Sequence, residues 1–513
     1  MGTDIPFGNL LFKDTISGAA FGIEVSDDME RPINPGALLS LNGAGIILNP
    51  AAGHETAGEA GRRRHIISSG SRKNICAYVT ASAGVHESTT DMVYGGHNII
   101  AENGEILSES GRFNRGQAML FADIDFELLR RERMQAHSFV ETAAYYADKP
   151  AFSVITIEPL KLFDSEKQSL IRIYSKSPFL AGPPDAAAEQ CKEIFEIQCA
   201  GLAKRLEHTG AVKSVIGVSG GVDSALALLI CAAAHKTLGK NTGDIAALTM
   251  PGFGTTDKTR ENALRIMELL GTDIREISIR DSVAQHFKDI SHDPENHNVT
   301  YENAQARERT QILMDIANSE NGIVIGTGDL SESALGWCTY CGDHMSMYNV
   351  NAGIPKTLVK SVLQWITDCK LNGPSGDKTF SSDNSALSYA IEDILNTPVS
   401  PELLPGDENE SITQKTEDMV GPYDLIDFFI YYTLKYGFSP EKLLYLANLA
   451  FAGDYSAETI RKWLSSFYKR FFSQQFKRSC MPDGPKAVAV GISPRGGLAM
   501  PSDAACEIWI KEE

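Results

Sequence analysis

The stretch KSVIGVSGGVDS, Lys213 to Ser224, decides the fold of this 513-residue chain. It begins as an apolar run suited to a buried strand and turns through Gly220 and Gly221 into a helix that starts at Asp223. Glycines in such a turn let backbone N–H groups approach an anion, and the helix N-terminus adds the positive end of its dipole. The segment from Gly217 to Ser224 therefore predicts a phosphate-binding turn between a strand and a helix.

The loop differs from the two best-known phosphate-binding motifs. It lacks the G-K-[ST] ending of a Walker A loop and the G-x-G-x-x-G spacing of a dinucleotide turn. Without a ligand, the two glycines are an ordinary connection of an α/β protein, and Asp223 is an N-cap or first-turn acid. The loop alone leaves both interpretations open.

Outward from the loop, helices and strands alternate strictly. Phe195, Cys199, Leu202 and Leu206 share one helix face, which ends at Gly210. Further strands are predicted at 244–250, 273–279 and 322–327, and helices at 257–271 and 303–317. Repeated βα units predict a doubly wound parallel sheet that binds its ligands at the carboxyl ends of the strands.

The N-terminal part of the chain follows another pattern. Short strands are predicted at 9–12, 19–25, 44–52, 74–83 and 97–107, the last with an Asn103-Gly104 hairpin turn. A charged helix at 127–137 follows, and the Gly-Pro-Pro of 182–184 marks a domain boundary. The polar segment 373–420 is predicted to be a loop.

Composition excludes several classes of partner. Asp and Glu number 66 against 47 Lys and Arg, and the net charge of -19 disfavours nucleic acids and anionic membrane surfaces. The nine cysteines are scattered, and Cys338-x-x-Cys341 has no second pair to complete a zinc site, which favours reduced thiols. The N-terminus does not resemble a signal peptide, and the apolar run 225–235 is too short to span a bilayer. These features predict a soluble cytoplasmic protein.

Longer motifs give the loop a context. S-G-G-x-D-S after the first strand of a parallel sheet resembles the pyrophosphate loop of the ATP pyrophosphatase superfamily, which cleaves ATP to AMP and pyrophosphate. Five later segments, in the expected order, resemble the synthetase domain of glutamine-dependent NAD synthetases. These segments are 250–263, 302–318, 325–362, 400–429 and 476–486. The resemblance implies an adenine nucleotide alpha-hydrolase-like synthetase domain over residues 186–513.

The resemblance also implies roles for individual residues. The ATP-binding residues implied are Gly217, Val218, Ser219, Gly220, Gly221, Val222, Asp223, Ser224, Arg307 and Thr327. The deamido-NAD-binding residues implied are Asn303, Glu332, Trp337, Cys338, Thr339, Tyr340 and Lys477. Trp337 suits stacking on a flat ring, although a tryptophan in an apolar segment is as often plain core.

Charge gives the site its chemistry. A carboxylate beside a phosphate loop is repelled by phosphate unless it holds a cation, so Asp223 and Glu332 are predicted to bind Mg²⁺ that bridges ATP phosphates. Asp223 and Lys356 are the predicted catalytic residues. Arg307, Lys356 and Lys477 would neutralise phosphate charge, although each taken alone also suits a solvated cation.

The implied reaction uses ATP and Mg²⁺ as cofactors. ATP adenylates the nicotinate carboxylate of deamido-NAD⁺ with release of pyrophosphate, and ammonia then displaces AMP to give NAD⁺. Positioning and charge stabilisation would supply most of the catalysis, in a site that excludes water. Family resemblance further implies a homo-oligomer.

Residues 1–140 resemble the back half of a nitrilase-like amidase domain, joined to the synthetase by residues 141–185. FGIEVSDDM, from Phe21, aligns with G-[IV]-E-[IV]-C-E-D-[LM]-W, so Ser26 takes the place of the cysteine nucleophile and Glu30 that of the tryptophan. The glutamine-holding N-L-S-A-S reads NPAAG from Asn49 to Gly53. The family's activating lysine and glutamate belong to the front half of the domain, before the first residue of this chain. A serine without a strong base is a weak nucleophile, so a degenerate glutaminase site is expected.

Several alternatives remain. The N-terminal half-domain persists as a packing or oligomerisation module, or the start of the chain lies elsewhere. The ammonia is free, supplied in trans, or drawn from glutamine by a partner or a fuller chain. A Ser26-based hydrolase, another adenylating ligase and a non-catalytic nucleotide-binding paralogue are the competing functions. The non-catalytic paralogue is favoured by Gly497, Leu498 and Ala499, which stand where the family commonly has Asp, Trp and Arg.

Overall fold

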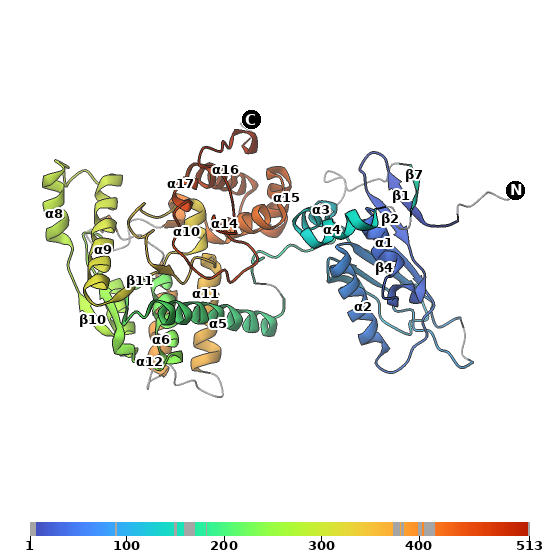
Figure 1. The fold of residues 1–513 in the computed structure, drawn as a ribbon, viewed down its shortest axis with the longest axis horizontal. Helices are drawn as coiled ribbons and strands as arrows, with labels where there is room; N and C mark the ends of the chain where they lie inside the picture. Colours follow the sequence, from blue (N-terminus) through green and yellow to red (C-terminus); the bar gives the residue numbers. More distant parts are fainter. Residues whose placement is uncertain are drawn as a thin grey trace. The chain divides into compact units, whose positions relative to one another are not determined.

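The computed structural model describes residues 7–87, 90–147, 151–158, 170–180, 182–372, 380, 384–398, 403–404 and 416–510. The chain forms two compact units, Met1–Ile173 and Tyr174–Glu513, each with its own sheet (Figure 1). About half of the predicted polar loop 373–420, and part of the motif at 400–429, lies outside the described residues. The described part contains the helices Asn384–Leu395 and Thr416–Val420, so the prediction of a loop is wrong there.

The N-terminal unit is built on a seven-stranded mixed sheet with the order β6-β5-β4-β3-β2-β1-β7. Its strands are β1 (Leu10–Asp14), β2 (Ala20–Ile23), β3 (Ile46–Ala51), β4 (Ala77–Ser82), β5 (Ile99–Glu102), β6 (Glu105–Glu109) and β7 (Ser153–Ile157). Its helices are η1 (Ser26–Glu30), α1 (Pro35–Leu41), α2 (Glu59–Asn74), α3 (Phe126–Gln135) and α4 (His137–Tyr146). Asn103 and Gly104 both have positive φ, 48° and 96°, and form the predicted hairpin turn between β5 and β6.

The two faces of this sheet differ. Leu39 of α1 and Ile67 of α2 pack with Leu11, Ile47 and Tyr78 in one buried core. On the opposite face the rings of Phe12 and Phe21 stack with centroids 5.0 Å apart, and the next outward side chain, Ile23, is exposed. The unit thus has the form of a half-sandwich, with helices covering one face of the sheet.

Strand β7 falls inside the segment predicted as a connection, 141–185. It pairs in parallel with β1 along its whole length, from Leu10↔Ser153 to Asp14↔Ile157, and the N-terminal unit extends to Ile173. A five-residue strand whose partner among the described strands is distant in sequence leaves no local signal of its pairing. Part of the segment predicted as a connection therefore belongs to the N-terminal unit.

The C-terminal unit contains a five-stranded sheet with the order β10-β9-β8-β11-β12, and every neighbouring pair is parallel. The strands are β8 (Lys213–Gly217), β9 (Ile245–Thr249), β10 (Asp273–Glu276), β11 (Gly322–Gly326) and β12 (Tyr348–Asn349). The prediction of an α/β fold with a doubly wound parallel sheet is confirmed. The strand order reverses between β8 and β11, so a ligand site is expected where these two strands end.

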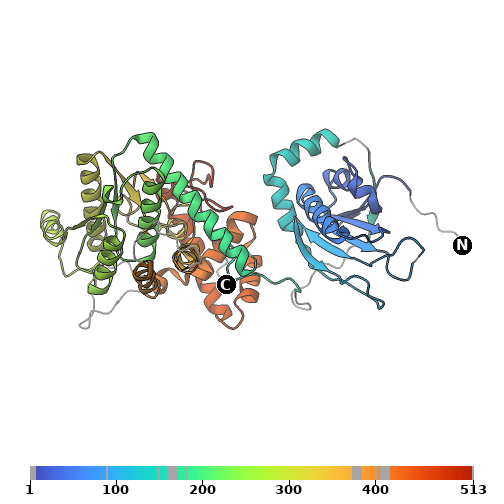
Figure 2. The ribbon, with the colours of Figure 1, turned by 90° about the horizontal axis from the view of Figure 1, so that it is seen from below.

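Helices lie on both sides of this sheet (Figure 2). Those around the sheet are α5 (Pro184–Thr209), α6 (Val222–Thr237), η2 (Thr242–Asp244), α7 (Asp257–Leu269), α8 (Arg280–Asp289), α9 (Val299–Ser319), α10 (Leu330–Leu335), α11 (Lys356–Trp365) and α12 (Asn384–Leu395). Phe287 of α8 and Tyr301 of α9 pack with Val215 and Leu248 in one core cluster. Helix α6 is buried almost all round, as its continuous apolar sequence requires.

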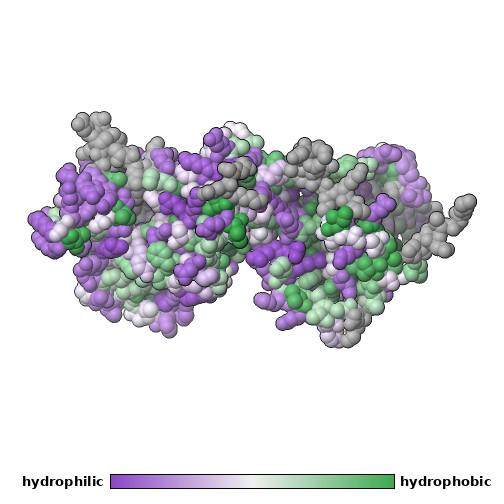
Figure 3. All heavy atoms as spheres, turned by 90° about the horizontal axis from the view of Figure 1, so that it is seen from above, coloured by the Kyte–Doolittle hydropathy of each residue, from purple (hydrophilic) through white to green (hydrophobic). Residues whose placement is uncertain are grey.

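A group of helices completes the unit at its C-terminal end. It comprises α13 (Thr416–Val420), α14 (Tyr423–Tyr431), α15 (Pro440–Ala450), α16 (Ala457–Ser473), α17 (Gln475–Arg478) and η5 (Glu507–Trp509), and two π-helical turns, η3 (Ile366–Leu371) and η4 (Tyr432–Tyr436), extend α11 and α14. Figure 3 shows hydrophilic and apolar side chains interspersed over the visible face of each unit. None of the described helices has the length and apolar character needed to cross a membrane.

The C-terminal turn explains one departure from the family pattern. A Cβ atom on Gly497 would lie 2.6 Å from the carbonyl carbon of Gly491, a backbone atom that cannot easily move. The N–H of Gly497 also donates to the carbonyl of Ser493 at 2.8 Å. An aspartate at position 497 would not fit this turn, so Gly497 is matched to the local backbone.

Candidate active site

The predicted phosphate loop lies at the switch point of the parallel sheet. Strand β8 ends at Gly217, and α6 begins at Val222 with Gly221 as its N-cap. The Ser224 hydroxyl donates to the Gly221 carbonyl at 3.1 Å and lies 3.2 Å from the Ser219 hydroxyl, which draws the loop closed. The buried Val218 donates its N–H to the Leu248 carbonyl of β9 at 2.7 Å. These contacts fix the loop before any ligand binds.

Gly220 is the position where only glycine fits. Its φ is +87°, and a Cβ would lie 2.1 Å from the carbonyl oxygen of Thr259 in α7. Gly221, next in the chain, has φ -92° and only the Ser219 hydroxyl, 3.5 Å away, near a built Cβ. The first glycine lets the loop pack on α7, and the second leaves room above the helix N-terminus.

Helix α10 brings carboxylates to the loop. Asp329 is its N-cap and forms a capping box, in which the Glu332 N–H donates to Asp329 Oδ1 at 2.8 Å and the Asp329 N–H donates to Glu332 Oε2 at 3.3 Å. Asp329 is fully buried, whereas the side chains of Asp223 and Glu332 remain 19% and 20% exposed. Carboxylate oxygens of these three residues lie within 4.8 Å of one another.

The Lys356 ammonium lies at the centre of these three carboxylates. Its Nζ is 2.5 Å from Asp223 Oδ2, 2.8 Å from Glu332 Oε1 and 3.0 Å from Asp329 Oδ2. Burial alone would lower the pKa of Lys356, but the carboxylates raise it well above its usual value, so the side chain is a cation. Burial raises the pKa of Glu332 to about 7, although Lys356 opposes that shift. The predicted catalytic pair, Asp223 and Lys356, is in direct contact.

The donor atoms fit a divalent cation. Mg²⁺ prefers oxygen ligands, and the cluster offers three carboxylates beside a phosphate loop. Two buried oxygens remain available within the described part of the chain: Asp223 Oδ1 has no hydrogen-bond partner, and Asp329 Oδ2 has only the ion pair with Lys356. Asp223 and Glu332, the predicted ligands, are the two with solvent access.

Three buried polar residues that sequence reasoning missed hold the site together. Asn351 donates from Nδ2 to the carbonyls of Asp223 and Thr327, both at 3.0 Å, and so joins the first turn of α6 to the end of β11. Asp427 of α14 accepts a hydrogen bond from the Ser331 hydroxyl and another from the Thr357 N–H at 3.0 Å. Asp329, the third, lies in the D-L-S-E of the quoted motif 325–362, where its capping-box spacing was a readable signal.

Asp427 gives the unit a pH-dependent stability. Burial raises the pKa of Asp427 from its usual 3.8 to about 6, against the hydrogen bonds from Ser331 and Thr357. Because the pKa of Asp427 is higher in the folded state than in the unfolded state, protonated Asp427 favours folding. This contribution to the free energy of unfolding is complete below the unfolded-state pKa and is lost as the pH rises through about 6. In Asp427→Asn this loss, roughly 1 to 1.5 kcal/mol between about pH 5 and 7.5, is expected to disappear from urea unfolding curves.

The control for that experiment is Asp281→Asn, an exposed first-turn acid on α8. This variant should keep the pH profile of the parent protein. A parental profile in Asp427→Asn would mean that another group carries the dependence.

The other end of α10 gathers the predicted deamido-NAD residues. Thr339 donates from its hydroxyl to Asn303 Oδ1 at 2.7 Å, and Arg307, one turn later on α9, donates to the Tyr340 carbonyl at 3.2 Å. Arg307 is thus in contact with this group, and its role in ATP binding stays a prediction. The Arg470 guanidinium lies over the Trp337 ring, with its Cζ atom 5.3 Å from the ring centroid.

The predicted cation Lys477 makes contacts with the protein backbone. Its Nζ donates to the carbonyls of Gly336 and Cys338, both at 2.7 Å, and Arg478 donates to the Ala334 carbonyl at 2.8 Å. Both side chains satisfy carbonyls at the C-terminal end of α10. Burial also raises the pKa of the Cys338 thiol, which keeps it protonated and unreactive.

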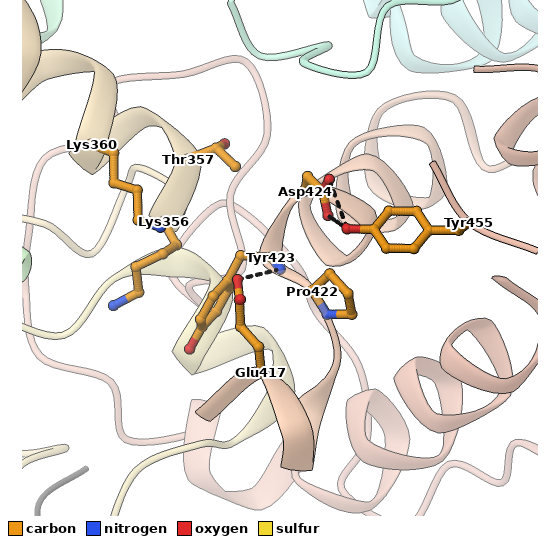
Figure 4. Close-up of a pocket in the computed structure, with 8 residues that line it drawn as sticks. All are labelled: Lys356, Thr357, Lys360, Glu417, Pro422, Tyr423, Asp424 and Tyr455. Atoms are coloured by element: carbon orange, nitrogen blue, oxygen red, sulfur yellow. Dashed lines mark hydrogen bonds between the residues drawn. The ribbon is translucent and has the colours of Figure 1, made fainter. Parts of the chain in front are cut away.

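A cavity of about 310 Å³ lies beside Lys356, on the side of α14 (Figure 4). Lys356, Thr357 and Lys360 approach it from α11, and Glu417, Pro422, Tyr423, Asp424 and Tyr455 line the rest. The Tyr455 hydroxyl donates to Asp424 at 3.2 Å. The cavity is polar, and Lys356 is one of the residues that line it.

Ser26 lies in the N-terminal unit, where it begins η1 with φ 50°, a strained value for a residue with a side chain. Its hydroxyl donates weakly to Asp27 at 3.3 Å and accepts from the Ala52 N–H at 3.4 Å. Among the described residues, no lysine or histidine lies within hydrogen-bond distance of this hydroxyl. The backbone displays Ser26 in a bent turn, but nothing described there activates it.

The fold and the C-terminal site define a class of enzyme. A phosphate loop at the switch point of a parallel sheet, with carboxylates and a buried lysine around it, is the arrangement of an α/β enzyme that binds a nucleotide by its phosphates. The family model described as NAD synthase matches residues 194–470. This range includes the phosphate loop, the three carboxylates and Lys356, but not Lys477.

Relatives identify the family. The glutamine-dependent NAD(+) synthetase of Mycobacterium leprae is 38% identical over 538 residues, covering 99% of this chain and 76% of the relative. That of Mycobacterium tuberculosis H37Rv is 38% identical over 539 residues, covering 100% and 77%. The crystal structure of the enzyme from Cytophaga hutchinsonii is 18% identical with a TM-score of 0.49, covering 98% of this chain and 73% of that one. The chain belongs to the glutamine-dependent NAD(+) synthetase family, and it is a ligase that uses ATP to form a carbon–nitrogen bond.

Proposed function

We propose that this chain converts deamido-NAD⁺ to NAD⁺ through an adenylated intermediate formed at the ends of β8 and β11. One observation carries this proposal: Lys356 Nζ lies within 3.0 Å of all three carboxylates beside the Ser219–Ser224 loop. Such a cluster offers both a cation position for ATP phosphates and a fixed positive charge for the pyrophosphate that leaves.

The substrates divide between the two ends of α10. ATP binds at the N-terminal end, where the N–H groups after Gly220 and the start of α6 face its phosphates, with Thr327 beside them. Deamido-NAD⁺ binds at the C-terminal end, against the loop Trp337–Tyr340 and Asn303 of α9. Glu332 lies between the two regions, and Lys477 supports the second by holding the carbonyls of Gly336 and Cys338.

The reaction proceeds in two steps. A nicotinate carboxylate oxygen attacks the α-phosphorus of ATP, the bond from that phosphorus to the bridging oxygen breaks, and pyrophosphate leaves with the bonding electrons. Ammonia then attacks the acyl carbon, AMP leaves, and the nitrogen loses a proton to give the amide. Lys356 stabilises the charge on the departing phosphates, and the protein's main contribution is to orient two anionic substrates and exclude water.

Mg²⁺ is the cofactor that the carboxylates fit. Asp223 and Glu332 would hold it, since their side chains retain solvent access beside the loop. A bound Mg²⁺ supplies charge neutralisation and orientation of the phosphates.

The ammonia in this proposal is free or comes from another protein. Ser26 replaces the cysteine of the family motif, and its hydroxyl contacts only Asp27 and the Ala52 N–H in the described part of the unit. An unactivated serine attacks an amide far more slowly than a thiolate. Self-association of the chain, which the family resemblance implies, remains a prediction.

A substrate test separates the sources of nitrogen. The purified chain, given ATP, Mg²⁺ and deamido-NAD⁺, is expected to form NAD⁺ and pyrophosphate in equal amounts with ammonium and at background rate with glutamine. Ser26→Ala should have parental rates with both. Glutamine-driven product that disappears in Ser26→Ala would show an active amidase, and ATP binding without pyrophosphate release would identify a non-catalytic paralogue.

A further inference from the structure

We propose that Asp329 is a positioning residue that holds the Lys356 ammonium, and that this ammonium occupies the position a divalent cation would take between Asp223 and Glu332. The first half concerns a residue with no predicted role in the chemistry. The second half rests on the proposed function, in which Asp223 and Glu332 are the metal ligands.

Burial separates Asp329 from the other two carboxylates. Asp329 is 0% exposed, whereas Asp223 and Glu332 are 19% and 20% exposed at their side chains. Asp329 Oδ1 accepts the capping hydrogen bond from Glu332, and Oδ2 has no partner in the described structure except the ammonium 3.0 Å away. A buried carboxylate needs a counter-ion. Lys356 is therefore the dedicated partner of Asp329, while the two outer carboxylates share it.

The lysine is held from several sides. Its side chain is 0% exposed, its backbone N–H donates to the Ser331 hydroxyl at 2.9 Å, and its Nζ lies 5.4 Å from the centre of the Tyr423 ring. A cation over an aromatic face is stabilised by the ring quadrupole. The anchored backbone and enclosed stem leave the ammonium little freedom to leave the carboxylates while the site holds no ligand.

Two cations cannot occupy this position together. The ammonium lies 2.5 Å from Asp223 Oδ2 and 2.8 Å from Glu332 Oε1, the distances of a closely bound cation. A divalent ion on the same two oxygens would face strong Coulomb repulsion from the ammonium. Lys356 should therefore weaken metal binding to the free protein, and Asp329 should retain the lysine close to the site when the outer carboxylates turn to a metal.

Mn²⁺ binding to the nucleotide-free full chain tests the cation position, by electron paramagnetic resonance of the unbound ion. Lys356→Met is expected to bind Mn²⁺ at least ten-fold more tightly than the parent, because the competing charge is gone. The matched control is Lys360→Met, one turn later on the same helix and outside the carboxylate cluster, which should bind like the parent. Equal affinity in Lys356→Met and the parent would overturn the cation-position half.

Asp329→Asn tests the positioning role. Asparagine caps a helix as well as aspartate does, so the variant keeps the shape and the cap while it removes the charge that holds Lys356. We expect kcat for NAD⁺ formation to fall about 100-fold, since a misplaced charge loses much of its stabilisation of the transition state, while KM for ATP changes less than about three-fold. Mn²⁺ binding in the presence of ATP should stay within about three-fold of the parent.

The outcomes distinguish the roles of Asp329. A parental kcat in Asp329→Asn, or in Asp329→Ser, which also caps, would mean that Asp329 serves only the helix. A large loss of Mn²⁺ affinity would make it a metal ligand and overturn the positioning role. The Mn²⁺ measurement on the free protein needs no turnover, so it holds or fails independently of the NAD synthetase reaction.

Discussion

Asp223→Asn is expected to lower the rate of NAD⁺ formation about a thousand-fold at saturating ATP and deamido-NAD⁺. Asp223 lies in the first turn of α6, directly after the phosphate loop, and its carboxylate contacts the Lys356 ammonium at 2.5 Å. Asparagine keeps the size of the side chain but loses both a charged metal ligand and the ion pair. The rate of pyrophosphate release is the appropriate measurement, because it reports the adenylation step itself.

The comparison for this variant is again Asp281→Asn, which changes a first-turn acid on α8 that contributes nothing to the site. The Asp281→Asn variant should form NAD⁺ at the parental rate. If Asp223→Asn kept more than a tenth of the parental rate with Mg²⁺ present, Asp223 would be only a first-turn acid of α6.

Gly220→Ala is expected to cost the C-terminal unit roughly 3 kcal/mol of unfolding free energy or more, and to abolish ATP binding. The added Cβ would lie 2.1 Å from the Thr259 carbonyl oxygen, and the φ of +87° is itself unfavourable for alanine. Relief of the clash must move the loop away from α7, which removes its N–H groups from the phosphates. Thermal unfolding and ATP titration of the same preparation measure both effects.

Gly221→Ala provides the matched control. Its φ of -92° is allowed for alanine, and the nearest atom to the new Cβ is a serine hydroxyl 3.5 Å away. We expect its unfolding free energy to stay within about 0.5 kcal/mol of the parent. A difference of less than about 1 kcal/mol between the two variants would contradict the close packing of the loop on α7.

The parallel sheet was predictable because its strands are short apolar runs between glycine turns and amphipathic helices. Strands β8, β9 and β11 and helix α7 lie within the ranges that their periodicity predicts. Helix α9 contains the predicted range 303–317 and extends beyond it at both ends, and α5 contains the predicted face from Phe195 to Leu206. Strand β12 was not predicted, because it has only two residues, Tyr348 and Asn349, and its pairing with β11 depends on the chain returning to the sheet. Helix α10, of six residues, is similarly too short for a periodic signal.

For the site, the sequence supplied the loop and the motifs, but not the contacts between them. Asp223 and Lys356 are 133 residues apart, and no local pattern indicates that their side chains meet. Asn351 and Asp427 appear in the sequence only as polar residues within apolar segments, with no sign of what they bind. Arg307 and Lys477 are predicted to bind substrate, and the sequence carries no sign that both also donate to backbone carbonyls of the 336–340 loop.

The sequence by itself determined the class of fold, the position of the phosphate loop and the family, because strand and helix periodicity, glycine turns and long motifs are all local properties of the chain. Only the tertiary structure decided which charges share one buried site. Burial acts on every carboxylate near Lys356 at once, and it leaves Asp329 enclosed with the ammonium while Asp223 and Glu332 keep contact with solvent. That division depends on how α6, α10 and α11 pack together, and packing between distant segments is not encoded at any single position.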